Sequence, residues 1–396
     1  MKVELLAPAG DLERLKTAVI YGANAVYFGG KQFSLRARAS NFTLEDIEKG
    51  VQFAHEHGAK AYVTVNMIPH NSDFEGLRDY LHILNEIGVD AIICASQAIL
   101  AISKEVAPDM EVHISTQQTT MNSKAIEYWQ KKGADRIVLG REATYDELLK
   151  IMEKTTLPVE VFIHGGMCAN YSGRCTISNV LTNRDANRGG CAQSCRWDYH
   201  LYHNDELLDR ELPFSLGSKD MSSPEYIERL MRSGACSFKI EGRMKTAFYL
   251  ANVIKGYRQL MDAYENKGTV SEEDLGIASE YLNNVANRET FPGFYPGIPD
   301  GNGQIYNNVN TANQMFVANV VSYDEETSLC RIEARNHFEK GDKLIVLRPE
   351  GRDYEFIADD IRDEEGNEVI VANKPMQILT VKLPCAADGY CYIYRK

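Results

Sequence analysis

Apolar and polar positions in the first half of the chain repeat one arrangement, in which a glycine is soon followed by a short apolar run. Between these runs lie stretches whose apolar positions recur every three to four residues, as on one face of a helix. Glycine suits the end of a helix because it readily adopts the left-handed backbone conformation. The pattern therefore predicts a repeating strand–helix unit. The glycines that open it are Gly22, Gly58, Gly88 and Gly133.

Eight short apolar segments can be counted as strands, and eight is the number that a closed β/α barrel needs. They are rich in β-branched residues, as expected of parallel strands covered on both faces. An open doubly wound sheet is the alternative, but no Gly-x-Gly-x-x-Gly turn follows the first strand. The predicted fold is a TIM-like (β/α)8 barrel. Its strands are predicted at 3–7, 25–28, 61–66, 91–95, 112–116, 136–140, 159–165 and 237–241.

The remainder of the chain predicts an insertion, two helices and a second domain. A cysteine-rich insertion at about 166–236 separates the seventh and eighth strands, within a barrel domain that spans 1–290. Helical periodicity runs over 247–267 and again to about residue 287. A passage rich in Gly, Pro and Asn at 291–309 is typical of a linker. Alternating segments at 315–323, 329–334, 342–347 and 378–382 predict a small all-β barrel over 310–396.

Composition narrows the class of protein. The chain has 396 residues and 44% hydrophobic content, enough for a barrel-sized core and a smaller domain. No window approaches the roughly 18 apolar residues of a membrane span, and the first residues lack the pattern of a signal peptide. We therefore expect a cytoplasmic protein without membrane contact. The formal net charge of -13 also disfavours non-specific binding to a polyanion.

One local patch could nevertheless contact RNA. Between residues 171 and 196 the chain carries four arginines and a single acid, Asp185. A solvated loop is the alternative interpretation of such a run. The candidate RNA-binding residues are Arg174, Arg184, Arg188 and Arg196.

Four cysteines follow the seventh strand, spaced as Cys168-x6-Cys175-x15-Cys191-x3-Cys195. In a reducing compartment, clustered cysteines bind metal or do chemistry more often than they form disulfides. Four thiolates suit either zinc or an iron–sulfur cluster. The paired Cys-x-x-Cys knuckles common in zinc ribbons are absent, which favours a cluster. Cys236, at the start of the eighth strand, is an alternative fourth ligand, although a buried structural thiol is the simpler interpretation.

The predicted strands end in polar residues. In a β/α barrel the C-terminal ends of the strands face the active site, and arginines at that rim suit an anionic small molecule. The alternative is that these charges pair as structural salt bridges. The candidate substrate-binding residues are Arg36, Arg38, Asn66, Arg141, Lys239 and Arg243, and the candidate proton-transfer residues are His164, Glu142 and Glu241.

Five stretches of the sequence point to a known family: Leu5–Gly10, Ala25–Gly30, His164–Cys175, Arg184–Trp197 and Phe238–Arg243. Together they closely resemble the peptidase U32 family, also called collagenase-like. The likeness covers the whole barrel. The linker and the small β domain look like the C-terminal domain of some members.

The resemblance implies more than the label of protease. Several members resemble oxygen-independent hydroxylation factors that act on the wobble uridine of tRNA with prephenate, on ribosomal RNA or on quinone precursors. These branches look like proteins with a 4Fe-4S cluster on four cysteines, which would map to Cys168, Cys175, Cys191 and Cys195. One barrel followed by one small β domain is most similar to the tRNA branch. Members usually carry Asp where this chain has Cys236.

We therefore expect an iron–sulfur protein that supports prephenate-dependent 5-hydroxylation of the wobble uridine in tRNA. Its expected partners are tRNA, the anionic co-substrate, and an electron donor or a second family member. A U32-type peptidase is the first alternative, although no His-Glu-x-x-His, Gly-x-Ser-x-Gly or Walker A motif occurs. The second is a zinc-stabilised module that binds RNA or protein.

Overall fold

The computed structural model describes residues 2–35, 41–208, 214–306 and 315–395. Its larger part is a closed barrel of eight parallel strands, in which the last strand pairs with both the seventh and the first. The predicted barrel is confirmed, and every predicted strand lies within two residues of the observed one. The strands are β1 (Glu4–Pro8), β2 (Ala25–Gly29), β3 (Lys60–Val65), β4 (Ala91–Cys94), β5 (Glu111–Ile114), β6 (Arg136–Val138), β7 (Val159–Gly165) and β11 (Ser237–Ile240).

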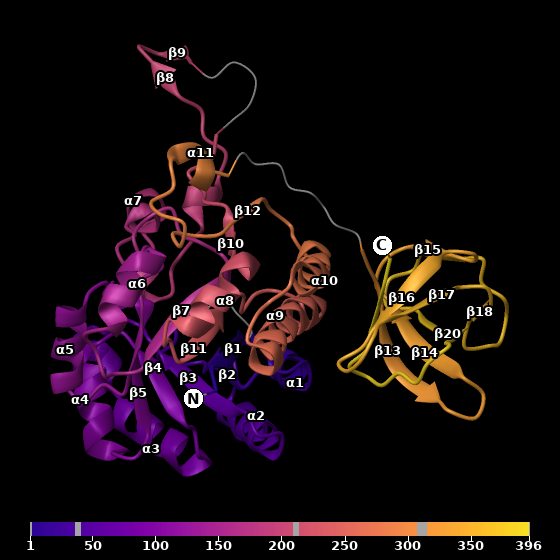
Figure 1. Ribbon diagram of the computed structural model, residues 1–396, viewed down its shortest axis with the longest axis horizontal. Coiled ribbons are helices and arrows are strands. Elements are labelled where there is room, and N and C mark those ends of the chain that lie inside the picture. The colour runs from indigo at the N-terminus through magenta and orange to yellow at the C-terminus, as the bar shows by residue number, and fades with distance from the viewer. Residues whose placement is uncertain (1, 36–40, 209–213, 307–314, 396) are drawn as a thin grey trace.

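A helix follows each strand and covers the outside of the barrel (Figure 1). Side chains at the helix starts accept hydrogen bonds from exposed backbone N–H groups, as in the capping boxes of Thr43 with Asp46 and Thr144 with Glu147. These two caps explain why helices begin at Leu44 and at Tyr145. The helices are α1 (Leu12–Ile20), α2 (Leu44–Glu56), α3 (Leu77–Ile87), α4 (Gln97–Val106), α5 (Ser123–Lys131), α6 (Tyr145–Met152), α8 (Ile227–Arg232) and α9 (Ala247–Lys267), and α10 (Glu272–Asn283) packs on α9.

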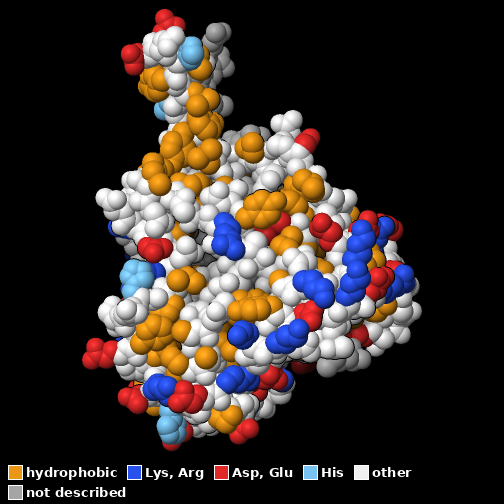
Figure 2. Space-filling view, turned by 90° about the vertical axis from the view of Figure 1, so that its left-hand side faces the viewer, with side chains coloured by type: hydrophobic (Ala, Val, Ile, Leu, Met, Phe, Trp, Pro, Cys, Tyr) orange, Lys and Arg blue, Asp and Glu red, His pale blue; other side chains and the backbone are white. Residues whose placement is uncertain are grey.

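The insertion after β7 lies at the C-terminal end of the barrel. It holds the short helix α7 (Ile177–Thr182), the hairpin of β8 (Tyr202–His203) and β9 (Glu206–Leu207), and β10 (Asp220–Ser222). β10 runs antiparallel to the last residues of β7. The hairpin projects from the body as an arm (Figure 1), and apolar side chains are exposed along it (Figure 2).

The passage predicted as a linker is largely folded. β12 (Thr290–Phe291) pairs with β10, and α11 (Gly301–Gln304) follows. The hydroxyl of Tyr295 donates to the carbonyl oxygen of Phe162 at 2.5 Å, inside the barrel wall. Residues 290–306 therefore belong to the barrel domain, because aromatic side chains anchor a segment whose glycines and prolines suggested a loop.

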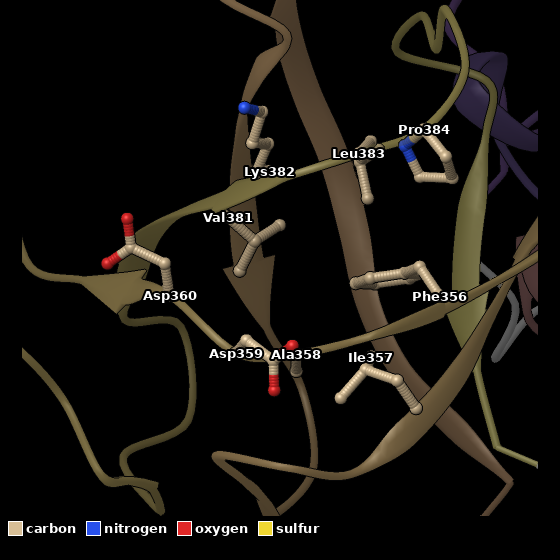
Figure 3. Close-up of a pocket in the computed structure, with 9 residues that line it drawn as sticks. All are labelled: Phe356, Ile357, Ala358, Asp359, Asp360, Val381, Lys382, Leu383 and Pro384. Carbon is tan, nitrogen blue, oxygen red and sulfur yellow. The ribbon is translucent and has the colours of Figure 1, made fainter.

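The C-terminal domain is an antiparallel sheet curled as a half-barrel around its own apolar core. A shallow pocket lies where its curl stays open, lined by residues 356–360 and 381–384 (Figure 3). The four predicted strands are present, and five shorter ones were missed. The strands are β13 (Phe316–Asp324), β14 (Leu329–Ala334), β15 (Phe338–Glu339), β16 (Lys343–Leu347), β17 (Tyr354–Ile357), β18 (Ile361–Arg362), β19 (Val371–Ala372), β20 (Ile378–Lys382) and β21 (Tyr392–Tyr394).

This domain packs against α1 and α9 of the barrel. The ring of Phe248 stacks on that of Phe316 with centroids 4.8 Å apart. The ammonium of Lys255, almost fully buried, pairs with Asp353 at 2.7 Å. The two domains therefore share one continuous interface of apolar and charged contacts. No helix among the described residues has the length and apolar character needed to cross a membrane.

Candidate metal centre and barrel mouth

The four cysteines of the insertion gather at the C-terminal end of the barrel. Burial raises the pKa of Cys195, and the negative charges of Cys168, Cys191 and Cys175 raise it further. Burial likewise raises the pKa of Cys168, with contributions from Cys191 and Cys175. Thiolate charges influence one another in this way only at short range. Residues 27 positions apart in sequence are therefore brought together in space.

The chemistry of this donor set fits a soft metal centre. All nine cysteines are free thiols, and the amide of Asn170 donates to the sulfur of Cys175 at 3.2 Å. Within the described residues, no group of three or more His, Cys, Asp or Glu side chains already has the geometry of a metal site. Four adjacent thiols remain the ligand type that iron–sulfur clusters and zinc share. The four-cysteine ligand set therefore stays a prediction.

Cys236 lies at the opposite end of the barrel. Its carbonyl oxygen accepts from the N–H of Glu4, at the start of the first strand. Burial raises the pKa of this thiol to about 12, and the charges of Arg136, Glu160 and Glu4 act on it. The alternative of Cys236 as the fourth ligand is therefore wrong. Cys236 precedes β11 at the N-terminal end of the barrel, whereas the other four thiols lie at the C-terminal end.

The loop from Cys168 to Cys175 is fastened to the ends of β5 and β6. Glu142 accepts hydrogen bonds from the backbone N–H and the hydroxyl of Ser172, at 2.8 and 3.2 Å. The hydroxyl of Thr119 donates to the Ser172 carbonyl at 2.6 Å. Gly173 has φ +74°, and a Cβ there would clash with a backbone carbonyl. Glu142, predicted to transfer protons, thus holds the thiol loop in place.

Arg141 and Glu241 meet beside the thiols, as predicted for the mouth. The guanidinium of Arg141 lies 3.9 Å from the ring centroid of Phe162 and 3.5 Å from the carboxylate of Glu241. Tyr27 donates to the same carboxylate at 3.3 Å. The charge of Arg141 counteracts the burial that raises the pKa of Cys168. A cation, a carboxylate and a phenol therefore share one small volume next to the thiols.

Arg243 is buried at the same rim, and both terminal nitrogens of its guanidinium make hydrogen bonds. Its guanidinium donates to the hydroxyls of Thr64 and Ser34 at 3.1 and 3.2 Å and to the amide oxygen of Asn41 at 3.0 Å. The side chain therefore fixes the loop after β2 against β3. These contacts give Arg243 a structural role at the rim, whether or not it also binds a substrate.

Asn66 also lies at the rim. Its amide donates to Gln117 at 2.8 Å and accepts from the N–H of Leu35 at 3.2 Å, so that it bridges two loops of the mouth. Arg36 and Arg38, predicted to bind substrate, lie outside the described residues.

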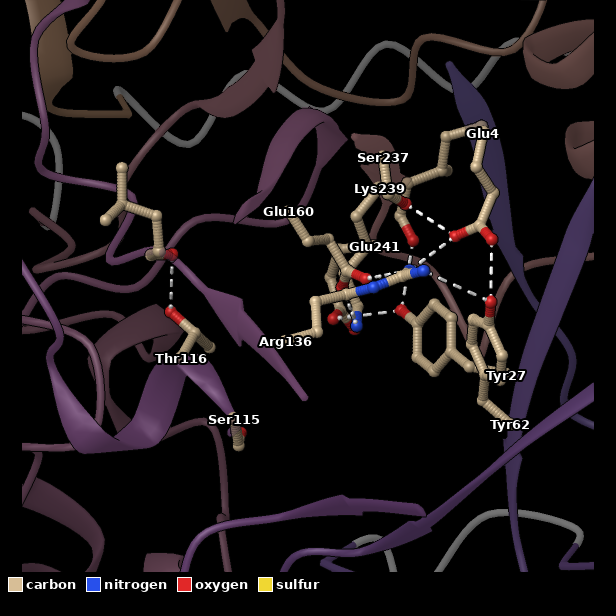
Figure 4. A network of polar contacts seen from close by, with 12 residues as sticks. Glu4, Tyr27, Tyr62, Ser115, Thr116, Arg136, Glu160, Ser237, Lys239 and Glu241 are labelled. Atoms are coloured by element: carbon tan, nitrogen blue, oxygen red, sulfur yellow. Dashed lines mark hydrogen bonds and ion pairs between the residues drawn. The ribbon is translucent and has the colours of Figure 1, made fainter. Parts of the chain in front are cut away.

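Lys239 lies inside the barrel and not at its mouth. Its ammonium pairs with Glu160 at 2.7 Å and lies 4.3 Å from the ring centroid of Tyr27. Arg136 bridges Glu160 and Glu4 at 3.2 and 2.7 Å, which closes a buried charged network (Figure 4). The prediction of a substrate-binding Lys239 is wrong, because its charge is already compensated within the barrel.

His164 is buried against α9. One ring nitrogen lies 3.3 Å from the hydroxyl of Tyr257, and the rings of Tyr249 and Tyr257 flank it. Burial, aided by the charge of Lys245, lowers the pKa of His164 to about 3. A histidine held neutral in this way is a poor proton acceptor near pH 7. The packing thus argues against the predicted proton-transfer role.

The four arginines of the predicted RNA patch differ in their surroundings. Arg174 and Arg184 are exposed, and Arg174 donates to a hydroxyl of the barrel rim at 3.2 Å. Arg188 forms two hydrogen bonds to the carboxylate of Asp73, at 2.5 and 2.8 Å. Arg196 faces a carboxylate at 3.8 Å. Two of the four, Arg188 and Arg196, therefore already face a carboxylate of the protein.

Asp220, Lys245 and Arg288 join Arg196 at the edge of the mouth and were not predicted as site residues. Asp220 opens β10, Lys245 follows β11, and Arg288 precedes β12. Each belongs to a different segment, so that no local spacing relates them. The one available signal was the position of Lys245 just beyond a barrel strand, where polar residues face the active site.

Comparison with protein-family models identifies the fold family. A model described as "Peptidase family U32" matches residues 10–305. The chain belongs to peptidase family U32. A second model, "Peptidase family U32 C-terminal domain", matches residues 312–395, which assigns the half-barrel domain to U32 as well. The resemblance carried by the five sequence stretches is confirmed.

Named U32 relatives resemble most of the chain. The "tRNA hydroxylation protein P1" of Bacillus subtilis (strain 168) is 44% identical over 392 residues, which are 96% of this chain and 92% of that protein. The "23S rRNA 5-hydroxycytidine C2501 synthase" of Escherichia coli (strain K12) is 38% identical over 71% of this chain and 43% of that protein. The "Collagenase" of Porphyromonas gingivalis (strain ATCC BAA-308 / W83) is 32% identical over 87% of this chain and 86% of that protein.

Proposed function

We propose that this U32 protein supports 5-hydroxylation of the wobble uridine in tRNA, with a 4Fe-4S cluster and prephenate as its anionic co-substrate. The observation that carries the proposal is the gathering of four thiols beside the Arg141–Glu241 pair at the barrel mouth. Relatives named for hydroxylation of tRNA and of ribosomal RNA support an RNA substrate.

Each part of the mouth has a role in this proposal. Cys168, Cys175, Cys191 and Cys195 would hold the cluster, which supplies one-electron chemistry when bound. Arg141 presents paired donors suited to a carboxylate of prephenate. Glu241 orients that guanidinium and can hold a proton beside the thiols, at the Oε2 atom that Tyr27 also approaches. An external electron donor or a second family member would complete the reaction.

Peptide hydrolysis is the second candidate, and the name of the Porphyromonas gingivalis relative favours it. A hydrolytic site needs a base within reach of a nucleophile or a bound water. The candidate histidine of this mouth, His164, is buried against α9 and held neutral. The side chains at the mouth thus support anion binding better than peptide cleavage.

Anaerobic purification followed by iron, sulfide and zinc analysis tests the metal assignment. We expect about four iron and four sulfide per chain and a brown colour, both lost in Cys195→Ser and kept in the control Cys385→Ser, in the C-terminal domain. Zinc with no sulfide would instead indicate the zinc-stabilised binding module.

A deletion strain tests the RNA assignment. 5-Hydroxyuridine-derived nucleosides should disappear from its tRNA and return with the wild-type gene but not with Cys195→Ser. Unchanged nucleosides in a strain without a redundant pathway would refute tRNA hydroxylation. Peptide cleavage by cluster-free protein would favour the peptidase.

A further inference from the structure

Three cationic side chains surround the single carboxylate of Asp220 at the edge of the mouth. Arg288 and Arg196 lie 3.5 and 3.8 Å from its Oδ1, and Lys245 lies 3.7 Å from its Oδ2. Three positive charges and one negative charge leave an excess of two positive charges. The neighbouring Lys219–Glu289 pair, whose residues directly precede β10 and β12, is neutral and leaves this excess unchanged.

The contacts around Asp220 are longer than those of a closed ion pair. Charge-assisted hydrogen bonds measure about 2.7–2.9 Å, as between Lys239 and Glu160 inside the barrel at 2.7 Å. Asp220 Oδ1 is buried and makes no hydrogen bond to any described residue. The side chain of Asp220 is 9% exposed, whereas each of the three cations is 24% exposed. The buried carboxylate therefore gathers cations whose outer faces remain open to solvent.

This cluster adjoins the thiols. The backbone of Gly166, two residues before Cys168, lies against the cluster. A Cβ at this position would be 3.6 Å from Arg196 and 3.9 Å from Asp220. Arg196 directly follows Cys195 in the chain. Any anion bound by the three cations would consequently lie beside the candidate metal centre.

We propose that Arg196, Lys245 and Arg288, held by Asp220, form an oxyanion site that binds a backbone phosphate of the RNA substrate. The inference rests on the proposed function. Guanidinium forks match phosphate oxygens in pairs. An excess positive charge at a partly exposed edge is what a phosphate contact needs in a chain of net charge -13.

A phosphate fits this site better than the carboxylate of a small co-substrate. The proposed partner of the small co-substrate is Arg141, whose side chain is only 10% exposed and lies within the mouth. Trp197 follows Arg196 and is 45% exposed, which offers a ring for base stacking next to the phosphate. Cation and aromatic side by side are the usual components of single-stranded RNA recognition.

The test is the affinity of the anaerobically purified full chain for a labelled anticodon stem-loop RNA, measured by anisotropy at several salt concentrations. Lys245→Gln and Arg288→Gln should each weaken binding about 3- to 10-fold and lower the salt slope by about one. The control Arg331→Gln removes an exposed cation of the C-terminal domain and should change nothing. Asp220→Asn should tighten binding, because it raises the positive excess.

The opposite response of Asp220→Asn separates an anion site from a structural ion cluster, whose loss would weaken binding in all three variants. Unchanged RNA affinity in Lys245→Gln and Arg288→Gln would overturn the inference, as would loss of prephenate binding or of iron with RNA affinity kept. If the wild-type chain binds no RNA, the proposed function fails first and the phosphate site with it.

Discussion

At the scale of single residues, the pair of Lys239 and Glu160 shows how a charged residue can belong to the interior of a barrel. Both side chains are at most 5% exposed. Arg136 and Glu4 add one further positive and one further negative charge to the network, so that the interior stays nearly neutral. The sequence showed only that Lys239 lies near the end of a strand. Residues near a strand end can point either to the mouth or into the interior of a barrel, so the sequence did not decide between them.

Replacing Lys239 by Met should destabilise the protein by about 3 kcal/mol, because Glu160 would lose one of its two buried partners. Urea unfolding measures the change. The matched control is Lys343→Met, which breaks the exposed pair with Glu355 and should cost less than about 0.5 kcal/mol. Equal effects of the two variants would show that the interior pair is not structural.

His164 should make stability depend on pH. Its pKa is about 3 in the folded chain and near 6.5 when unfolded, so that only the unfolded chain takes up the proton in between. Stability is therefore lost as the pH falls from about 6.5 towards 3. His164→Phe should remove about 2 kcal/mol of the loss between pH 7 and pH 5, measured by urea unfolding at both values. A variant with the same loss as the wild type would contradict the burial of the neutral ring.

At the scale of elements, the loop from Cys168 to Cys175 depends on a residue 26 positions before Cys168. Glu142→Ala should lower the iron retained per chain after anaerobic purification, because Ser172 would lose its two hydrogen bonds to Glu142 and keep only the one from Thr119. Glu142→Gln keeps an acceptor and should retain most of the iron. The control Glu153→Ala removes an exposed carboxylate of the same barrel half. Equal iron in all of these variants would contradict the tethering role.

The barrel elements could be predicted from sequence because helical and strand periodicity is a local property of the chain. The mouth could be predicted only in part. The polar ends of strands placed Arg141 and Glu241 at one mouth, although not as a pair. The side chain of Lys239, however, points into the barrel, and His164 packs against α9. The grouping of Lys245 and Arg288 around Asp220 depends on three segments meeting in space, which no local pattern records.

At the scale of the whole molecule, α9 serves two domains at once. One face packs on the barrel, and Phe248 and Lys255 contact the C-terminal domain. The two domains should therefore unfold in one cooperative transition, even though each has its own core.

Phe248→Ala should weaken this coupling. Truncation of a buried Phe costs about 3–5 kcal/mol, and here much of the loss falls on the interface with Phe316. Calorimetry should show one transition in the wild type and two in the variant. Ile277→Ala, on the exposed side of α10, should keep the single transition. Two transitions in the wild type would show that the domains are independent.

The β8–β9 arm lies near the middle of the chain. Seven strands of the barrel and all four cysteines of the thiol cluster precede it, whereas the closing strand β11 and the C-terminal domain follow it. β11 is held by its pairing with β1 and β7 and by the Lys239–Glu160 contact. A nick in the exposed hairpin would thus leave two fragments joined without a covalent bond. The two fragments on either side of the hairpin should therefore reassemble when they are produced as separate chains.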